Sequence, residues 1–151
     1  MTLWVDADSC PRPVRDLILK TGNRRGLPVR FVANRKIPST LEFPFEMIIA
    51  DTAPDAADDY IVENAEASDL VITRDIPLAK RLVDARISVI NDRGAVYTDT
   101  NINERLAMRN LMLDLFNNGI MPDKTGTFGK KEIQDFANAL DREITRLTKN
   151  R

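Results

Sequence analysis

Two closely spaced aspartates stand near the beginning of the chain. The stretch WVDADSCP, residues 4–11, places Asp6 and Asp8 two positions apart, directly after an apolar segment typical of a buried strand. A buried carboxylate costs free energy unless it is hydrogen-bonded, neutralised or bound to a cation. The spacing therefore predicts that these carboxylates have a binding partner.

Further aspartates lie within two residues of the ends of later apolar segments. These are Asp51, Asp75 and Asp92. Aspartate is also common in turns and at helix N-caps, and that ordinary role is preferred for Asp51 and Asp92. Asp75 follows a short apolar strand typical of the centre of a parallel sheet, as Asp6 does, so for these two the functional interpretation is favoured.

A predicted helix over residues 54–67 adds Asp55, Asp58 and Asp59. At about 100° per residue, Asp58 lies at the flank of the apolar face and Asp59 points to solvent. Asp58 is therefore the helix carboxylate best placed to reach the acids at the strand ends. Asp55 either favours the helix dipole in the first turn or belongs to the site, and both interpretations stay open.

A cluster of Asp6, Asp8, Asp58 and Asp75 favours a divalent metal ion, because neighbouring carboxylates raise each other's pKa values unless a cation lies among them. The chain has no histidine and a single cysteine, Cys10, which excludes His- or Cys-ligated zinc and the Ser-His-Asp and Cys-His mechanisms. Oxygen ligands favour Mg²⁺ or Mn²⁺. Such an ion supports hydrolysis of a phosphodiester or phosphate ester.

Cys10 itself is expected to be a small buried residue at the entrance of the first helix. Without a histidine in the chain, no base of the usual kind can activate its thiol. Neighbouring carboxylates would also raise the pKa of the thiol, so Cys10 is not expected to act as a nucleophile.

Strands and helices must alternate to bring these acids to one edge. Strands are predicted at residues 3–5, 29–33, 47–50, 70–73 and 87–90, and helices at about 11–25, 54–67, 76–85, 102–116 and 131–148. Ser9 is a candidate cap of the first helix and Gly26 ends it. Residues 34–45 and 117–129 are predicted loops.

The alternation predicts a three-layer α/β/α fold with a mostly parallel central sheet, whose ligand site lies at the carboxyl ends of the strands. The helices at 102–116 and 131–148 are expected to pack on the same core, so residues 1–151 form one domain. No apolar segment approaches the length of a membrane span, and no secretory-signal pattern is present. With a single cysteine, these features are typical of a cytoplasmic protein.

Charge is divided unevenly along the chain. Residues 51–75 contain eight acids and one base, whereas residues 12–36 contain eight Lys or Arg and one acid. Exposed helices carry charge in any case, so this pattern alone is weak evidence for a charged substrate. An acidic pocket beside a basic surface nevertheless suits a polyanionic substrate such as nucleic acid.

Three stretches carry a resemblance to a known family. DADSCP, DAADDYIVENAEASDLVITRDIPLA and RGAVYT are similar to motifs of the YaiI/YqxD family of uncharacterised bacterial proteins, over most of the chain. That family is regarded as PIN-like, and the middle stretch resembles the PIN nuclease pattern, in which an acid on a helix precedes a strand ending in Thr-x-Asp. The resemblance implies metal binding by Asp6, Asp58 and Asp75. Asp55 and Thr73 are candidates for the outer shell of this site.

Other positions match or depart from the family pattern. Asp8 matches the second acid of the opening motif, Arg93 and Gly94 match an Arg-Gly turn, and Arg109 matches a later arginine. Asp92 stands where a proline is expected, so it is not counted in the site. The loop KTGTFGKKE, residues 124–132, lacks the proline-rich turn associated with the family. The resemblance implies a fold and a site but no substrate.

The favoured function is a Mg²⁺- or Mn²⁺-dependent nuclease, with RNA preferred over DNA as the partner and no membrane association. The proposed metal ligands are Asp6, Asp58 and Asp75, with Asp8 as a further ligand or the residue that orients water. Phosphate contacts are assigned to Arg12, Arg74 and Arg93.

Two alternatives remain. The DAD motif after the first strand resembles the nucleophile and acid of haloacid-dehalogenase-like phosphatases, although Lys80 is poorly placed for the lysine of that class. A non-catalytic RNA-binding or regulatory module would keep the acids for a structural purpose. Fold alone does not choose among these functions.

Overall fold

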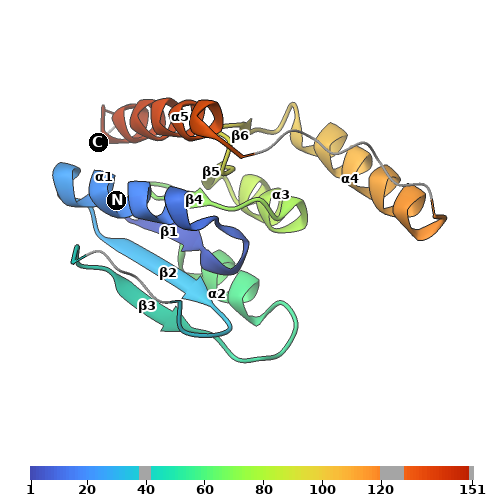
Figure 1. The fold of residues 1–151 in the computed structure, drawn as a ribbon, viewed down its shortest axis with the longest axis horizontal. Coiled ribbons are helices and arrows are strands. Elements are labelled where there is room, and N and C mark those ends of the chain that lie inside the picture. The colour runs from blue at the N-terminus through green and yellow to red at the C-terminus, as the bar shows by residue number, and fades with distance from the viewer. Residues whose placement is uncertain (38–41, 120–127, 150–151) are drawn as a thin grey trace.

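A six-stranded sheet forms the centre of the molecule (Figure 1). The structure is a computed structural model and describes residues 1–37, 42–119 and 128–149. The strands are β1 (Leu3–Asp6), β2 (Val29–Ala33), β3 (Glu46–Ile49), β4 (Leu70–Ile72), β5 (Ser88–Ile90) and β6 (Val96–Tyr97), in the spatial order β3-β2-β1-β4-β5-β6. Strands β1 to β5 run parallel and β6 is antiparallel to β5.

The mostly parallel sheet predicted from the sequence is confirmed, and β1 and β4 lie side by side at its centre. Because both strands run in the same direction, their carboxyl ends meet at one edge of the sheet. Strand β6 was not predicted, since two residues are too few to show an alternating pattern.

Helices cover both faces of the sheet, which gives the predicted three layers. The elements are α1 (Arg12–Arg25) and α5 (Lys130–Lys149) on one face and α2 (Ala56–Asn64) and α3 (Ile76–Asp84) on the other. Along β1, Leu3 and Val5 pack toward α1 and α5, whereas Trp4 packs toward α2 and α3. Successive strand residues point to opposite faces, so Asp6 shares the face of Trp4, on the side of α2.

The helix ends differ in part from the expectation. Gly26 ends α1 in the left-handed conformation, with φ of 68°, as predicted. Ser9 does not cap α1: it lies in a short 3-10 helix, η1 (Ala7–Ser9), and the N-cap of α1 is Pro11, which has no side-chain cap. Helix α2 is shorter than predicted because Asp55 before it has a positive φ of 65° and Ala65 after it is extended.

The last two helices behave differently from each other. Helix α5 buries Phe136, Leu140 and Ile144 against the core, as expected. Helix α4 (Ile102–Asn117) contacts α3, but Ile102 is its one buried residue, and the helix extends away from the rest of the molecule (Figure 1). The expected packing on the core therefore holds for α5 and only for the first turn of α4.

Some expectations fall on residues 38–41 and 120–127. Parts of the two predicted loops, and the first half of the KTGTFGKKE stretch, lie outside the described residues. Among the helices that the structure describes, none combines the length and apolar character needed to cross a membrane.

Candidate active site

Five aspartates line one cavity of about 260 Å³. It lies where the carboxyl ends of β1 and β4 meet the first turn of α2. The lining residues are Asp6, Asp8, Ser9, Asn34, Asp55, Ala57, Asp58 and Asp75. The structure therefore brings together the four acids that the sequence predicts as metal ligands, together with Asp55.

Asp6 is the most buried of these carboxylates, with 5% of its surface exposed. Its Oδ2 accepts hydrogen bonds from Thr73 Oγ1 at 2.7 Å and from Ser9 Oγ at 2.9 Å. Burial raises the pKa of Asp6, the two hydroxyl donors oppose that change, and the nearby charges of Asp75 and Asp8 add to it. The pKa of Asp6 therefore responds to the other acids of the cavity.

Asp75 begins α3 and is joined to Asp6 through Thr73. The Asp75 N–H donates to Thr73 Oγ1 at 3.0 Å, and Asp75 Oδ1 accepts from the Leu78 N–H at 3.1 Å as the N-cap of the helix. Asp75 therefore does cap a helix, which is the ordinary role considered for these aspartates. The cap uses one oxygen of its carboxylate and leaves the other oxygen outside the cap.

Asp58 is half-buried in the first turn of α2. Its pKa is raised to about 6, first by burial and then by the charges of Asp75, Asp6 and Asp55, while Arg81 lowers it. Asp59 is exposed, as the helical spacing predicts, and it pairs with Arg81 at 2.8 Å. Of the two neighbouring helix acids, Asp58 is the one that lines the cavity.

Asp8 and Asp55 stand at the rim. Both are exposed, and Asp8 Oδ2 accepts a 3.0 Å hydrogen bond from the Asn34 N–H at the end of β2. Asp55 has left-handed backbone geometry, which aspartate tolerates better than most residues, and its side chain makes no capping bond to α2. Asp55 therefore precedes the first turn of α2, in which it was expected, and it lines the cavity.

Asp6 differs from Asp69, a second buried aspartate, in the number of its carboxylate oxygens that accept a hydrogen bond. Both oxygens of Asp69 are satisfied by three donors, the N–H groups of Thr2 and Glu66 and Nε1 of Trp4. Within the described part of the chain, Oδ1 of Asp6 has no such donor. Asp69 is thus a structural carboxylate, and Asp6 keeps an oxygen available to a ligand.

Two other carboxylates of the cavity also have available oxygens. Among the described residues, no donor bonds Oδ2 of Asp75 or either oxygen of Asp58. In the same part of the chain, however, no three acidic or cysteine side chains are already arranged as a metal-ion site. Carboxylate oxygens are suitable ligands for Mg²⁺ or Mn²⁺. The aspartate side chains would have to move closer together to share one ion.

The predicted phosphate contacts are dispersed. Arg74 is 51% exposed at the end of β4 and pairs with Asp92, which is buried and does not line the cavity. Arg93 lies elsewhere: it approaches Glu132 of α5 at 3.8 Å and stacks over Phe128. The structure therefore places neither Arg74 nor Arg93 in the lining of the cavity, and Arg74 is next to it only in sequence, before Asp75.

The basic residues of α1 differ in their distance along the chain from the cavity, and some of them have identified partners. Arg24 pairs with Asp141 at 3.0 Å and Arg15 donates to the Cys10 carbonyl at 2.6 Å. Arg12 is exposed in the first turn, three residues after Ser9 of the cavity lining. Among the α1 cations, the one nearest the cavity in sequence is therefore Arg12.

Cys10 is buried, with 6% of its surface exposed, in the core between the sheet and α1. Burial raises the pKa of its thiol to about 12, and the carboxylates of Asp92 and Asp6 add to the effect of burial. The expectation of a small, buried side chain agrees with this position.

Ser9 was missed as a partner of the site. Its position three residues after Asp6 was interpreted as a helix cap, whereas the η1 turn directs its hydroxyl to Asp6. A serine three residues after an acid is the local signal that could have indicated this bond. The Asn34 contact uses a backbone N–H, which no sequence motif reveals.

Comparison with known proteins adds a family. Residues 4–146 match the family described as "Uncharacterized BCR, YaiI/YqxD family". A "UPF0178 protein" of Treponema pallidum (strain Nichols) is 53% identical over 147 residues, covering 97% of this chain and 83% of the relative. One from Treponema denticola is 51% identical over 151 residues, covering 100% and 96%, and one from Trichlorobacter lovleyi is 43% identical over 147 residues, covering 97% and 96%. No solved structure matches the chain.

Proposed function

We propose that this chain, which belongs to the YaiI/YqxD family, is a nuclease that hydrolyses phosphodiesters with a carboxylate-bound Mg²⁺ or Mn²⁺ ion. The observation that carries the proposal is the group of acids with available oxygens at the carboxyl edge of a parallel sheet. Open parallel sheets place their ligands at that edge. RNA is the preferred substrate and DNA the second.

The proposed ligands are Asp6, Asp58 and Asp75. Ser9 and Thr73 hold one oxygen of Asp6 and leave the other for the ion. When bound, the ion lowers the pKa of a coordinated water and stabilises the charge that develops on the phosphoryl group. Burial is the main cause of the raised pKa values of Asp6 and Asp58, and the bound ion would offset the repulsion from neighbouring carboxylates that adds to it.

Two further residues have proposed roles around these ligands. Asp8 lies at the rim of the cavity and would orient a water molecule or complete the ligand set. Arg74 adjoins Asp75 in sequence, and its half-exposed guanidinium would contact a phosphate next to the scissile one. Its bond to Asp92 holds the guanidinium at the sheet edge.

The two alternatives fare differently. A haloacid-dehalogenase-like phosphatase needs a lysine at the site, but Lys80 pairs with Asp84 at 3.0 Å on α3 and does not line the cavity. The non-catalytic module keeps more support, because among the described residues no three acidic side chains are already placed to share one metal ion. We therefore retain the binding module as the second candidate.

The test is cleavage of labelled RNA, DNA and a generic phosphate ester with Mg²⁺, with Mn²⁺ and with EDTA. We expect metal-dependent cleavage of RNA that falls by at least about 100-fold in Asp6→Asn and Asp75→Asn. Asp114→Asn, which removes an exposed carboxylate on α4, is the matched control and should cleave normally. Cleavage that survives both cavity substitutions would place the activity outside this cavity, and cleavage that is absent with every metal would favour the binding module.

A further inference from the structure

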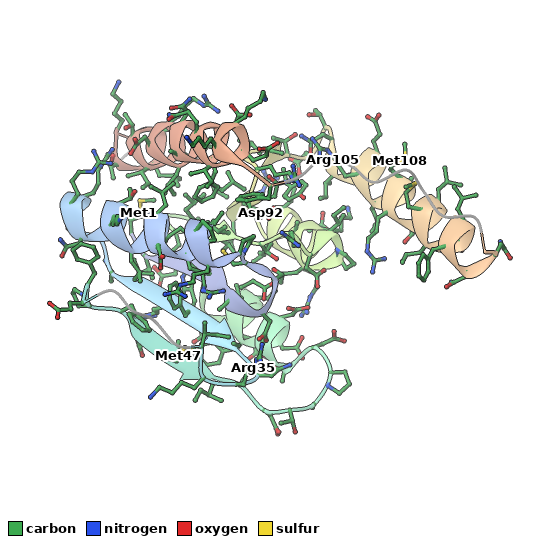
Figure 2. The ribbon with its side chains drawn as sticks, in the orientation of Figure 1. Met1, Arg35, Met47, Asp92, Arg105 and Met108 are labelled. Atoms are coloured by element: carbon green, nitrogen blue, oxygen red, sulfur yellow. The ribbon has the colours of Figure 1, made fainter. Side chains whose placement is uncertain are left out.

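Helix α4 forms a second cavity, of about 500 Å³, with the start of α3. Its lining includes Ile76 from α3 and, from α4, Arg105, Arg109, Met112 and Phe116. Figure 2 shows Arg105 and Met108 along α4: Arg105 lies near the body of the molecule, with its guanidinium 5.8 Å from the centre of the Tyr97 ring, and Met108 lies farther out. We call this cavity the α3–α4 groove.

The charges of α4 are separated between two sides of the helix. At about 100° per residue, Arg105, Arg109, Met112 and Phe116 fall within about 60° of one another, on the side of the groove. Asp114 falls on the opposite side of the helix. In the described part of the chain, neither arginine has an acidic side chain within ion-pair distance. The groove therefore combines an apolar floor with a cationic rim.

Consecutive residues at the start of α3 line the groove and the acidic cavity. Asp75 lines the acidic cavity, and the next residue in the chain, Ile76, lines the groove. A chain-like ligand that extends from the groove past Ile76 would arrive at Asp75, the N-cap of α3. Beyond its first turn, α4 contributes no buried residue to the core, so the apolar side chains of the groove are left exposed by the fold.

We propose that the α3–α4 groove binds a single-stranded segment of the nucleic acid that enters the acidic cavity. The proposal rests on the nuclease function proposed above and names the class of its substrate. A single strand carries a phosphate at every nucleotide for Arg105 and Arg109, and unpaired base faces for Phe116 and Met112. A duplex stacks its bases inside the helix and cannot offer those faces, so the groove selects single strands.

The test is binding of the full-length protein in EDTA, where metal-dependent cleavage does not interfere. The probes are fluorescent single-stranded oligouridylate, oligothymidylate and an RNA duplex, measured by anisotropy at several salt concentrations. We expect the single strands to bind more tightly than the duplex. Arg109→Gln should weaken single-strand binding and reduce the log–log salt slope by about one. Phe116→Ser should weaken it by about 5- to 100-fold.

Two matched variants control for charge and for exposed apolar surface. Arg86→Gln removes an exposed cation that lines a different cavity, beside β5 and β6. Leu111→Ser removes an apolar side chain that is 52% exposed, close to the 56% of Phe116, from another side of α4. Both variants should bind the single strand as the unaltered protein does.

Each outcome separates the groove from the metal site. Single-strand binding that holds while no metal supports cleavage keeps the groove and overturns the nuclease function. Cleavage that persists unchanged in Arg109→Gln and Phe116→Ser, with unchanged binding, overturns the groove and keeps the nuclease. If Phe116→Ser and Leu111→Ser instead convert a dimer to a monomer in light scattering without a change in single-strand binding, a second copy of the chain is the occupant and the proposal is wrong.

Discussion

Thr73 Oγ1 donates a 2.7 Å hydrogen bond to Oδ2 of Asp6, which joins the ends of two neighbouring strands across 67 positions of sequence. Both residues are buried, and the same hydroxyl oxygen accepts the N–H of Asp75. Thr73 thereby sets the position of both proposed metal ligands without being one. Its single hydroxyl links the geometry of Asp6 to the start of α3.

Replacing Thr73 by valine should destabilise the fold. The substitution keeps the shape of the side chain but removes a donor to a buried carboxylate, at a cost of about 1–3 kcal/mol. For a chain of this length the melting temperature should fall by roughly 2–10 °C. Thermal unfolding of Thr73→Val, with Thr73→Ser as the hydroxyl-retaining control, checks this. Equal melting temperatures for the valine variant and the unaltered protein would contradict it.

The metal-free protein should lose stability as the pH rises from about 4 to about 6. The pKa of Asp58 is raised from 3.8 to about 6 in the folded protein, so between these values the folded state binds more protons than the unfolded state. Stability is therefore highest below pH 4 with respect to this group and is lost as the pH passes 6. Asp6, whose pKa is also raised, acts in the same direction.

Asp58→Asn should flatten this pH dependence. Because Asp58 is only half-buried, solvent screening limits the effect to about 2–4 °C in melting temperature across the interval. Melts in EDTA at several pH values compare the variant with the unaltered protein. The prediction is contradicted if the stability of the metal-free protein rises between pH 4 and 6 and Asp58→Asn shows the same rise. In that case the pKa of Asp58 is not raised in the folded protein.

Mg²⁺ or Mn²⁺ should stabilise the protein. A ligand that binds only the folded state at 100 times its dissociation constant adds about 2.7 kcal/mol, which corresponds to roughly 5–10 °C here. The increase should be absent from Asp6→Asn and Asp75→Asn and present in Asp114→Asn. If the two cavity variants gain the same stability from Mn²⁺ as the unaltered protein, the ion binds elsewhere.

Cys10→Ala should leave any activity within a few-fold. The pKa of about 12 leaves almost no thiolate at neutral pH, and the side chain lies in the core. We expect a stability loss of about 1 kcal/mol from the smaller side chain. The thiol of the folded protein should react slowly with a disulfide reagent and rapidly after unfolding. Complete loss of cleavage at an unchanged melting temperature would instead assign Cys10 a chemical role.

Arg12 and Arg24 should differ in their effect on nucleic-acid binding. Arg12 lies in the first turn of α1, close in sequence to the cavity, whereas Arg24 is at the far end and pairs with Asp141. Arg12→Ala should weaken binding of any sequence and reduce the log–log salt slope by about one. Arg24→Ala should change neither. Filter binding across salt concentrations measures both, and equal effects would indicate general electrostatic attraction in place of a local contact.

Local pattern was sufficient for much of the fold. Apolar strands with helices between them predicted the parallel sheet, because the side-chain period and the connection lengths are properties of short segments. The acids at the ends of β1 and β4 could be assigned to one edge because parallel strands share their direction. Asp58 could be separated from Asp59 because one residue turns a helix by about 100°.

Only the tertiary structure decided which side chains meet. Arg93 pairs with Glu132 on α5 and Ser9 bonds to Asp6, although the sequence favoured a phosphate contact for Arg93 and a helix cap for Ser9. Asp6 and Asp69 are both buried aspartates, yet only Asp69 has both oxygens satisfied by donors within the described residues. The sequence did not indicate the exposure of α4 either. Burial and partner choice depend on chain segments brought together by folding, and the amino-acid types at one position do not determine them.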